Sequence, residues 1–150
     1  MINEGDTFPS FSLQDQTGKT WTNEDLKGQR AVIYFYPKDD TSGCTVEACE
    51  FNDALPNVPN AKVFGVSPDS TKSHDRFAQK FGLKFTLLAD TEHALAEACG
   101  VWVEKSMYGK KYMGVERTTF LVDESGKVAK IWRKVTPQGH AAEALASLTA

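Results

Sequence analysis

The apolar run AVIYFY at residues 31–36 limits the folds open to this chain more than any other segment. It is continuous rather than alternating and is rich in β-branched and aromatic residues, as is typical of a central strand buried on both faces. The run ends at Pro37, and a helical pattern follows from about Gly43 to Leu55. The sequence therefore predicts a strand–loop–helix unit at the centre of a sheet.

Further strands and helices alternate along the rest of the chain. Alternating apolar residues on either side of the turn QDQTGK predict an N-terminal β-hairpin. A helix begins after the capping residue Ser70 and ends at Gly82. The patterns also predict strands at 62–67, 85–90, 118–123 and 127–132, and a last amphipathic helix at 140–148.

This order of elements is typical of the α/β class, with a mixed central sheet and helices on both of its faces. The chain has 150 residues, which is enough to bury a sizeable core without a covalent staple. Because no linker or repeat divides it, we expect a single domain over residues 1–150.

Charge and hydropathy exclude several classes of function. The 17 basic and 20 acidic residues give a net charge of −3, and no basic cluster could follow a phosphate backbone, so we expect no nucleic-acid partner. No apolar run approaches the roughly 18 residues of a membrane span, and the N-terminus lacks the apolar core of a secretion signal. With only three cysteines, the composition predicts a cytoplasmic protein whose thiols are reduced.

Two of these cysteines, Cys44 and Cys49, fall within the helix predicted after the central strand. Cys44 lies in its first turn, where unpaired backbone N–H groups and the helix dipole favour an anion, so we expect the thiolate form to be stabilised. On a helix, Cα atoms five residues apart are about 8.7 Å from one another. A disulfide needs less than about 7 Å, so a bridge between the two would require this turn to unwind.

The residues alone leave three interpretations of this pair. A metal site is disfavoured, because a C-x4-C spacing with only Cys99 and three histidines elsewhere supplies too few ligands in the usual pattern. Packing is the simplest interpretation, since free cysteine is among the most buried residue types. Redox chemistry is the third, and the residue types and spacing do not decide between it and packing.

The surrounding pattern favours chemistry. Pro37, Thr41 and Cys44 form the sequence P-x-x-x-T-x-x-C directly after the apolar strand, and this resembles the active-site signature of peroxiredoxins. The stretch DDTSGCTVEACEF is similar to the branch called bacterioferritin comigratory protein, or PrxQ. The segments GDTFPSFSLQDQTGKTW, GVSPDS and ERTTFLVDESGKV resemble the same family, so the likeness covers essentially the whole chain and implies a thioredoxin-like fold.

The resemblance implies a complete reaction. Cys44 would be the peroxidatic cysteine, which attacks hydrogen peroxide or an organic hydroperoxide and becomes a sulfenic acid. Cys49 would resolve it through an intramolecular Cys44–Cys49 disulfide, which thioredoxin or a similar dithiol would then reduce. The family pattern implies neither a cofactor nor a metal, and we expect a monomer.

Three further residues take roles from the resemblance. Thr41 would bind the peroxide oxygens, although its hydroxyl also suits a helix cap. Arg117 would favour the thiolate and polarise the peroxide, although an arginine before a strand is usually a solvated rim residue. Pro37 would shape the loop and shield the sulfur. Glu47 shares the helix face of Cys44 and either orients Arg117 or is solvated.

The remaining cysteine and histidines are predicted to be structural. We expect Cys99 to pack in the core near a helix end. The chain has three histidines, which lie at polar helix starts, where exposure or capping is the expected role: His74, His93 and His140.

Two other functions are possible for a reactive cysteine at a helix start. A thioredoxin-type disulfide oxidoreductase would need C-x-x-C at the helix start and a proline before the later core strand, and VERTTF carries none. A non-catalytic thiol redox sensor or binding module on the same fold stays open, because sensing and catalysis share the sulfenic acid step.

Overall fold

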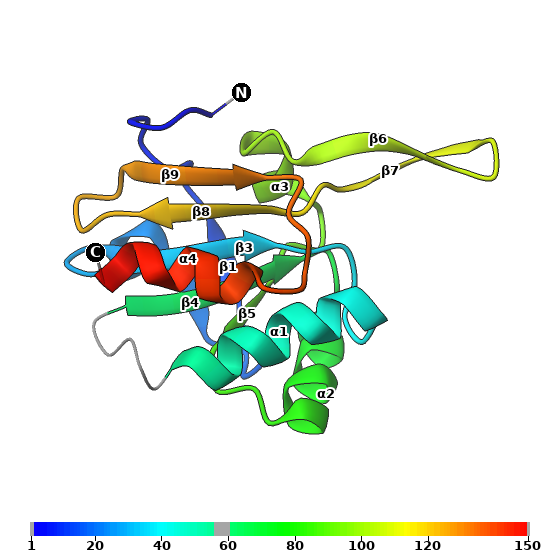
Figure 1. Ribbon diagram of the computed structural model, residues 1–150, viewed down its shortest axis with the longest axis horizontal. Helices are drawn as coiled ribbons and strands as arrows, with labels where there is room; N and C mark the ends of the chain where they lie inside the picture. The colour runs from blue at the N-terminus through cyan, green and yellow to red at the C-terminus, as the bar shows by residue number, and fades with distance from the viewer. Residues whose placement is uncertain (1, 56–60, 150) are drawn as a thin grey trace.

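The architecture is seen in a computed structural model that describes residues 2–55 and 61–149 (Figure 1). Its centre is a five-stranded sheet with the order β5-β4-β3-β8-β9. The first three of these strands run parallel, and the last two are antiparallel to their neighbours. The bounds are Arg30–Phe35 for β3, Ala61–Ser67 for β4, Thr86–Ala89 for β5, Thr118–Val122 for β8 and Val128–Arg133 for β9.

Helices cover both faces of this sheet, as the sequence predicts (Figure 1). One face packs against α1, α2 and α4, and the other against α3, the 3-10 helix η1 and the N-terminal hairpin β1–β2. The helices are α1 (Ser42–Ala54), α2 (Thr71–Phe81), α3 (Ala94–Ala98), α4 (His140–Thr149) and η1 (Asn23–Leu26), and the hairpin strands are β1 (Ser12–Gln14) and β2 (Thr20–Thr22). No helix within the described ranges is long and apolar enough to span a membrane.

The sequence of the central strand β3 is apolar without alternation because both faces of the strand pack against the core. Ala31, Ile33 and Phe35 face one half of the core, and Val32 and Tyr34 face the other half. All five are buried, so both faces of the strand are withdrawn from water. The predicted strand and the helix after it are confirmed within the described residues.

An aromatic stack fixes α1 to the sheet. The ring of Tyr34 on β3 stacks on the ring of Phe51 on α1, with centroids 4.7 Å apart. Tyr34 pairs in register with Gly65 on β4, and the absence of a side chain there makes room for the tyrosine ring. This stack fixes the second half of α1 to the sheet. The first turns of α1 extend toward the carboxyl end of β3, where the cysteine segment begins.

A second hairpin projects away from the body of the molecule (Figure 1). It consists of β6 (Trp102–Met107) and β7 (Lys110–Val115), which pair only with each other among the described strands. Tyr108 at its tip is 96% exposed. The sequence pattern predicts no strands here, because neither face of the outer half packs on a core and the period-two signal is therefore absent.

The close approach at Gly65 yields a test of the packing. A Cβ at this position would lie 2.9 Å from atoms of both Leu87 and Tyr34. We expect Gly65→Ala to lower the free energy of unfolding by about 1–3 kcal/mol, measured by urea denaturation. The control is Gly114→Ala, whose Cβ would meet only flexible side chains, the nearest being Lys105 at 3.3 Å. Equal losses in the two variants would contradict this account.

Candidate active site

Cys44 sits at the mouth of α1, just beyond the carboxyl end of β3. The first backbone hydrogen bond of the helix runs from the Thr45 N–H to the Thr41 carbonyl, at 2.8 Å. The N–H groups of Ser42, Gly43 and Cys44 therefore precede the hydrogen-bonded ladder, and their dipoles favour a negative charge nearby. The Cys44 residue is only 1% exposed, so a thiolate at this position is shielded from bulk water.

A cationic side chain reaches the sulfur from the other side. Arg117, in the segment between β7 and β8, places its Nη2 3.0 Å from the Cys44 Sγ. A guanidinium at this distance donates a hydrogen bond to the sulfur and stabilises its thiolate form. The structure thus brings together two of the residues singled out by sequence, although they are 73 positions apart.

Glu47 holds the arginine in this position. Its Oε1 lies 3.1 Å from the Arg117 Nη1, so one guanidinium contacts both the carboxylate and the sulfur. Glu47 is 1% exposed, and of its two interpretations the solvated helix glutamate is wrong. Burial raises the pKa of Glu47 to about 7, because the loss of hydration outweighs the attraction of Arg117.

Gly43 makes this approach sterically feasible. A Cβ at position 43 would lie 3.0 Å from the Arg117 Nη2 and 3.3 Å from a ring carbon of Pro137. The first turn of α1 is therefore in close contact with the guanidinium and with the segment that leads into α4. A glycine at the start of a helix gives no sequence signal that would separate this steric role from an ordinary one.

Lys105 is a second cation near this group, and the sequence did not indicate it. It lies on β6, in the hairpin that the sequence pattern does not predict. Burial and the charge of Arg117 lower the pKa of Lys105, while Cys44 and Glu116 act in the opposite direction. The projecting hairpin therefore adds a basic side chain to the surroundings of the sulfur.

Thr41 and Pro37 occupy the loop before the helix. Thr41 is the N-cap residue, but its side chain does not cap the helix, because its hydroxyl donates instead to the Lys38 carbonyl at 3.0 Å. Its side chain is exposed, and Pro37 is half-buried at the end of the strand. Among the hydrogen bonds of the described residues, the one to the Cys44 sulfur comes from Arg117 and not from either of these two.

The other two cysteines differ in accessibility. Cys49 is half-buried on α1, and burial together with the Asp53 carboxylate raises the pKa of its thiol. Cys99 ends α3 and is 0% exposed, which confirms the predicted core position. Burial and the Asp90 carboxylate raise the pKa of Cys99 to about 12, so it stays a thiol at neutral pH.

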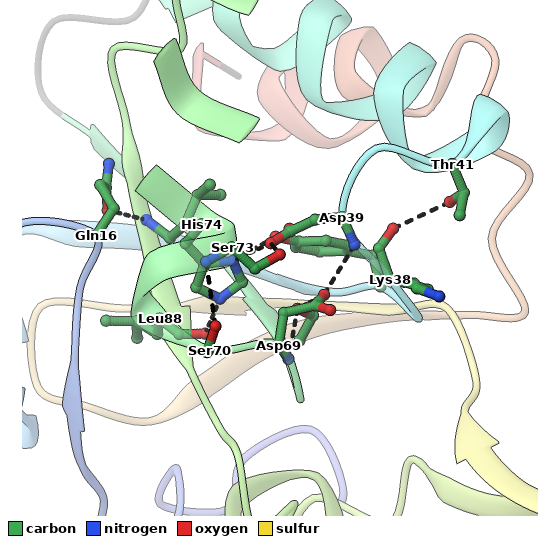
Figure 2. A network of polar contacts seen from close by, with 12 residues as sticks. Gln16, Lys38, Asp39, Thr41, Asp69, Ser70, Ser73, His74 and Leu88 are labelled. Atoms are coloured by element: carbon green, nitrogen blue, oxygen red, sulfur yellow. Dashed lines mark hydrogen bonds and ion pairs between the residues drawn. The ribbon is translucent and has the colours of Figure 1, made fainter. Parts of the chain in front are cut away.

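The loop between β3 and α1 is attached to α2 by a buried polar network (Figure 2). Asp39 of the loop contacts His74 of α2, and His74 is 0% exposed. The prediction of exposed or capping histidines is therefore wrong for His74, and also for His140, which is buried against the Thr119 hydroxyl. Each lies in the first turns of a helix but faces the sheet, where a buried partner satisfies the ring. His93 begins α3 as its N-cap residue and stacks on a tryptophan ring.

Fold and site together define a class of protein. A mixed sheet with helices on both faces carries a cysteine at a helix N-terminus, and an arginine held by a buried glutamate contacts its sulfur. This arrangement stabilises a thiolate in a shielded place and leaves polar groups around it, as thiol-dependent reduction of a peroxide requires.

Comparisons with known proteins agree with this class. The family model described as the AhpC/TSA family matches residues 4–131. The peroxiredoxin Bcp of Bacillus subtilis is 48% identical over 149 residues, covering 98% of this chain and 95% of that protein. The peroxiredoxin Bcp of Escherichia coli K12 is 43% identical over 141 residues, covering 93% and 90%. A solved structure of the Xanthomonas campestris bacterioferritin comigratory protein has a TM-score of 0.88 and 46% identity, covering 93% and 90%.

The chain belongs to the AhpC/TSA family, and within it to the peroxiredoxins of the bacterioferritin comigratory protein (PrxQ) branch. It is therefore a thiol-dependent peroxidase with a thioredoxin-like fold. The fold class and the family predicted from the sequence are both confirmed.

The raised pKa of Glu47 predicts a stability that depends on pH. Between about pH 4.5 and 7 the folded protein binds a proton at Glu47 that the unfolded chain has released, so stability falls as pH rises through this window. Glu47→Gln removes this dependence. We therefore expect the variant to gain stability relative to the wild type between pH 5 and pH 7.5, measured by urea denaturation. A difference that stays constant across these pH values would show that Glu47 is ionised throughout.

Proposed function

We propose that this chain, as a single-domain cytoplasmic monomer spanning residues 1–150, reduces hydrogen peroxide and organic hydroperoxides with Cys44 as the peroxidatic cysteine. The observation that carries the proposal is the 3.0 Å contact between the Arg117 guanidinium and the Cys44 sulfur at the mouth of α1. The solved structures of the Xanthomonas campestris relative concern its reduction of alkyl peroxides, which supports an organic substrate here as well.

In the first step, the Cys44 thiolate attacks one oxygen of the hydroperoxide. A sulfur–oxygen bond forms and the oxygen–oxygen bond breaks, which leaves a sulfenic acid and an alkoxide or hydroxide that takes up a proton. Arg117 stabilises the charge that moves from sulfur to the leaving oxygen. The N–H groups of the first helical turn and the Thr41 hydroxyl, once it turns from the Lys38 carbonyl, would hold the peroxide oxygens. Pro37 would shape the loop around them.

In the second step, Cys49 attacks the sulfenic sulfur. A sulfur–sulfur bond forms and water leaves, so the two cysteines end as a disulfide. Helix geometry keeps their Cα atoms about 8.7 Å apart, so the first turns of α1 must open for each turnover. A dithiol protein such as thioredoxin then reduces the bridge, and α1 can wind again.

The alternative is a non-catalytic redox sensor that uses the same thiol. Both functions pass through the sulfenic acid, so its formation alone does not distinguish them. Multiple turnovers with a dithiol reductant would distinguish the peroxidase from the sensor. The similarity to curated peroxiredoxins favours catalysis.

The assignment of the nucleophile is tested with Cys44→Ser. We expect peroxide-dependent NADPH consumption, with thioredoxin and its reductase, to fall by more than about 10³-fold, because serine cannot form the reactive thiolate. Cys99→Ser is the matched control, because Cys99 is buried in the core away from the site. Normal turnover in the Cys44 variant would rule out this nucleophile.

The resolving step is tested with Cys49→Ser. We expect the sulfenic acid at Cys44 to form at the wild-type rate, trapped with dimedone and seen by mass spectrometry, because the groups that contact the Cys44 sulfur are unchanged. Turnover through an internal bridge is lost, since no second sulfur is within reach. In the oxidised wild type we expect a peptide that links Cys44 to Cys49. A link between Cys44 and Cys99 would refute the assignment.

A further inference from the structure

A buried ion pair joins the loop before α1 to a neighbouring helix. The Nδ1 of His74 on α2 lies 2.7 Å from the Oδ2 of Asp39 in the loop (Figure 2). The two side chains are 0% and 3% exposed. The peroxidase chemistry described above makes no use of this pair, and a buried ionisable pair beside an active-site loop calls for an explanation.

Further hydrogen bonds hold both side chains of this pair in place. The Nε2 of His74 lies 2.9 Å from the Leu88 carbonyl, which can only accept. The Asp39 carboxylate receives the Tyr36 hydroxyl at 2.6 Å and the Ser73 hydroxyl at 2.8 Å, so its oxygens also act as acceptors. The Nε2 of His74 therefore donates to β5, while its Nδ1 shares a hydrogen bond with Asp39. Removing either side chain leaves buried polar atoms of the other without a partner, which is strongly unfavourable.

A second carboxylate extends the attachment to β4. The Oδ2 of Asp69 accepts the backbone N–H of Asp39 at 2.8 Å and the Ser67 hydroxyl at 2.6 Å. Ligand atoms of Asp39, Asp69 and His74 lie within 4.8 Å of one another, as in a cation site. The hydrogen bonds of these three side chains within the protein already account for their close approach. The cluster therefore attaches the backbone of the loop to its neighbours.

These contacts connect the loop to elements other than α1. The partners of Asp39 belong to α2, to the end of β3 and to the segment after β4, while the Leu88 carbonyl belongs to β5. The next residue, Asp40, has a φ of 57° and is ion-paired with Lys80 of α2. The helix itself begins only after Thr41, with the bond to the Thr45 N–H.

We propose that the Asp39–His74 pair fixes the N-terminal boundary of the segment that unwinds, so that the loop 37–40 keeps one conformation in the reduced and disulfide forms. This inference rests on the proposed Cys44–Cys49 bridge. Opening is then confined to the chain after Asp40. When the disulfide is reduced, the unmoved loop positions the first turn of α1 as it forms again beside Arg117. Asp39 and His74 are positioning residues, since neither contacts the sulfur.

Hydrogen exchange of single amides tests this boundary without relying on activity. We expect the Asp39 N–H to be equally protected in the reduced protein and in the disulfide form, because Asp69 accepts it in both. The Thr45 N–H, which closes the first turn, loses protection on oxidation. The His74 N–H, bonded to the Ser70 carbonyl, is the reference that does not change. Exposure of the Asp39 amide in the disulfide form would overturn the inference. If oxidation gives no Cys44–Cys49 bridge at all, the proposed function fails instead.

Variants test the same pair through the two kinetic steps. We expect His74→Gln to slow sulfenic acid formation by about 10- to 100-fold in single-turnover measurements, because the loop no longer holds the first turn in place. Disulfide formation, which needs the open helix, keeps its rate or becomes faster. Asp39→Asn retains the shape and lets a neutral His74 accept from the amide, so we expect sulfenic acid formation within about 3-fold of the wild type.

The control and a milder variant complete the test. Gln79→Ala removes hydrogen bonds on the same helix that reach only Asp75, so we expect it to leave both steps unchanged. If His74→Gln does not fold, Ser73→Ala removes a single donor from the Asp39 carboxylate and is expected to slow the first step in the same direction. Equal slowing of both steps, or an Asp39→Asn variant as impaired as His74→Gln, would contradict the role of the pair as an anchor.

Discussion

A negatively charged sulfur in a shielded position is stable only where positive groups face it, and the fold is arranged to provide them. Strand β3 pairs with β8 in antiparallel register, Phe35 opposite Thr118. The end of one strand and the start of the other therefore meet at the same edge of the sheet. Cys44 follows the first and Arg117 precedes the second, so sheet register delivers the guanidinium to the mouth of α1.

The same helix has to satisfy two opposing demands. In the proposed cycle it must hold the Cys44 sulfur among its unpaired N–H groups, and it must open to let that sulfur meet Cys49. The ends of α1 and α2 differ accordingly. Ser70 caps α2 with a side-chain hydrogen bond, whereas Thr41 turns its hydroxyl away from α1. A cap of this kind contributes roughly 0.5–2 kcal/mol to a helix, so its omission makes the first turn of α1 easier to open.

Local sequence patterns predict the central strands and the helices α1, α2 and α4, because burial on one or two faces leaves a periodic pattern along the chain. They place Cys44 in the first turn of a helix, but its predicted role follows from the resemblance of P-x-x-x-T-x-x-C to the peroxiredoxin signature. Arg117 follows only from the family resemblance, since its contact with a helix 73 positions away leaves no local trace. His74 is mistaken for a surface residue for the same reason, because its partner Asp39 lies 35 positions away. The hairpin β6–β7 escapes prediction because its outer half packs on nothing that would impose a pattern.

Three cysteines allow three pairings, and the proposed cycle uses one of them. Cys99, at the end of α3, is buried and remains protonated at neutral pH, whereas thiol exchange proceeds through a thiolate. In the proposed cycle, oxidation therefore joins Cys44 to Cys49 and leaves no mispaired isomers to sort. One round of reduction restores every copy to the same starting state, without the aid of an isomerase.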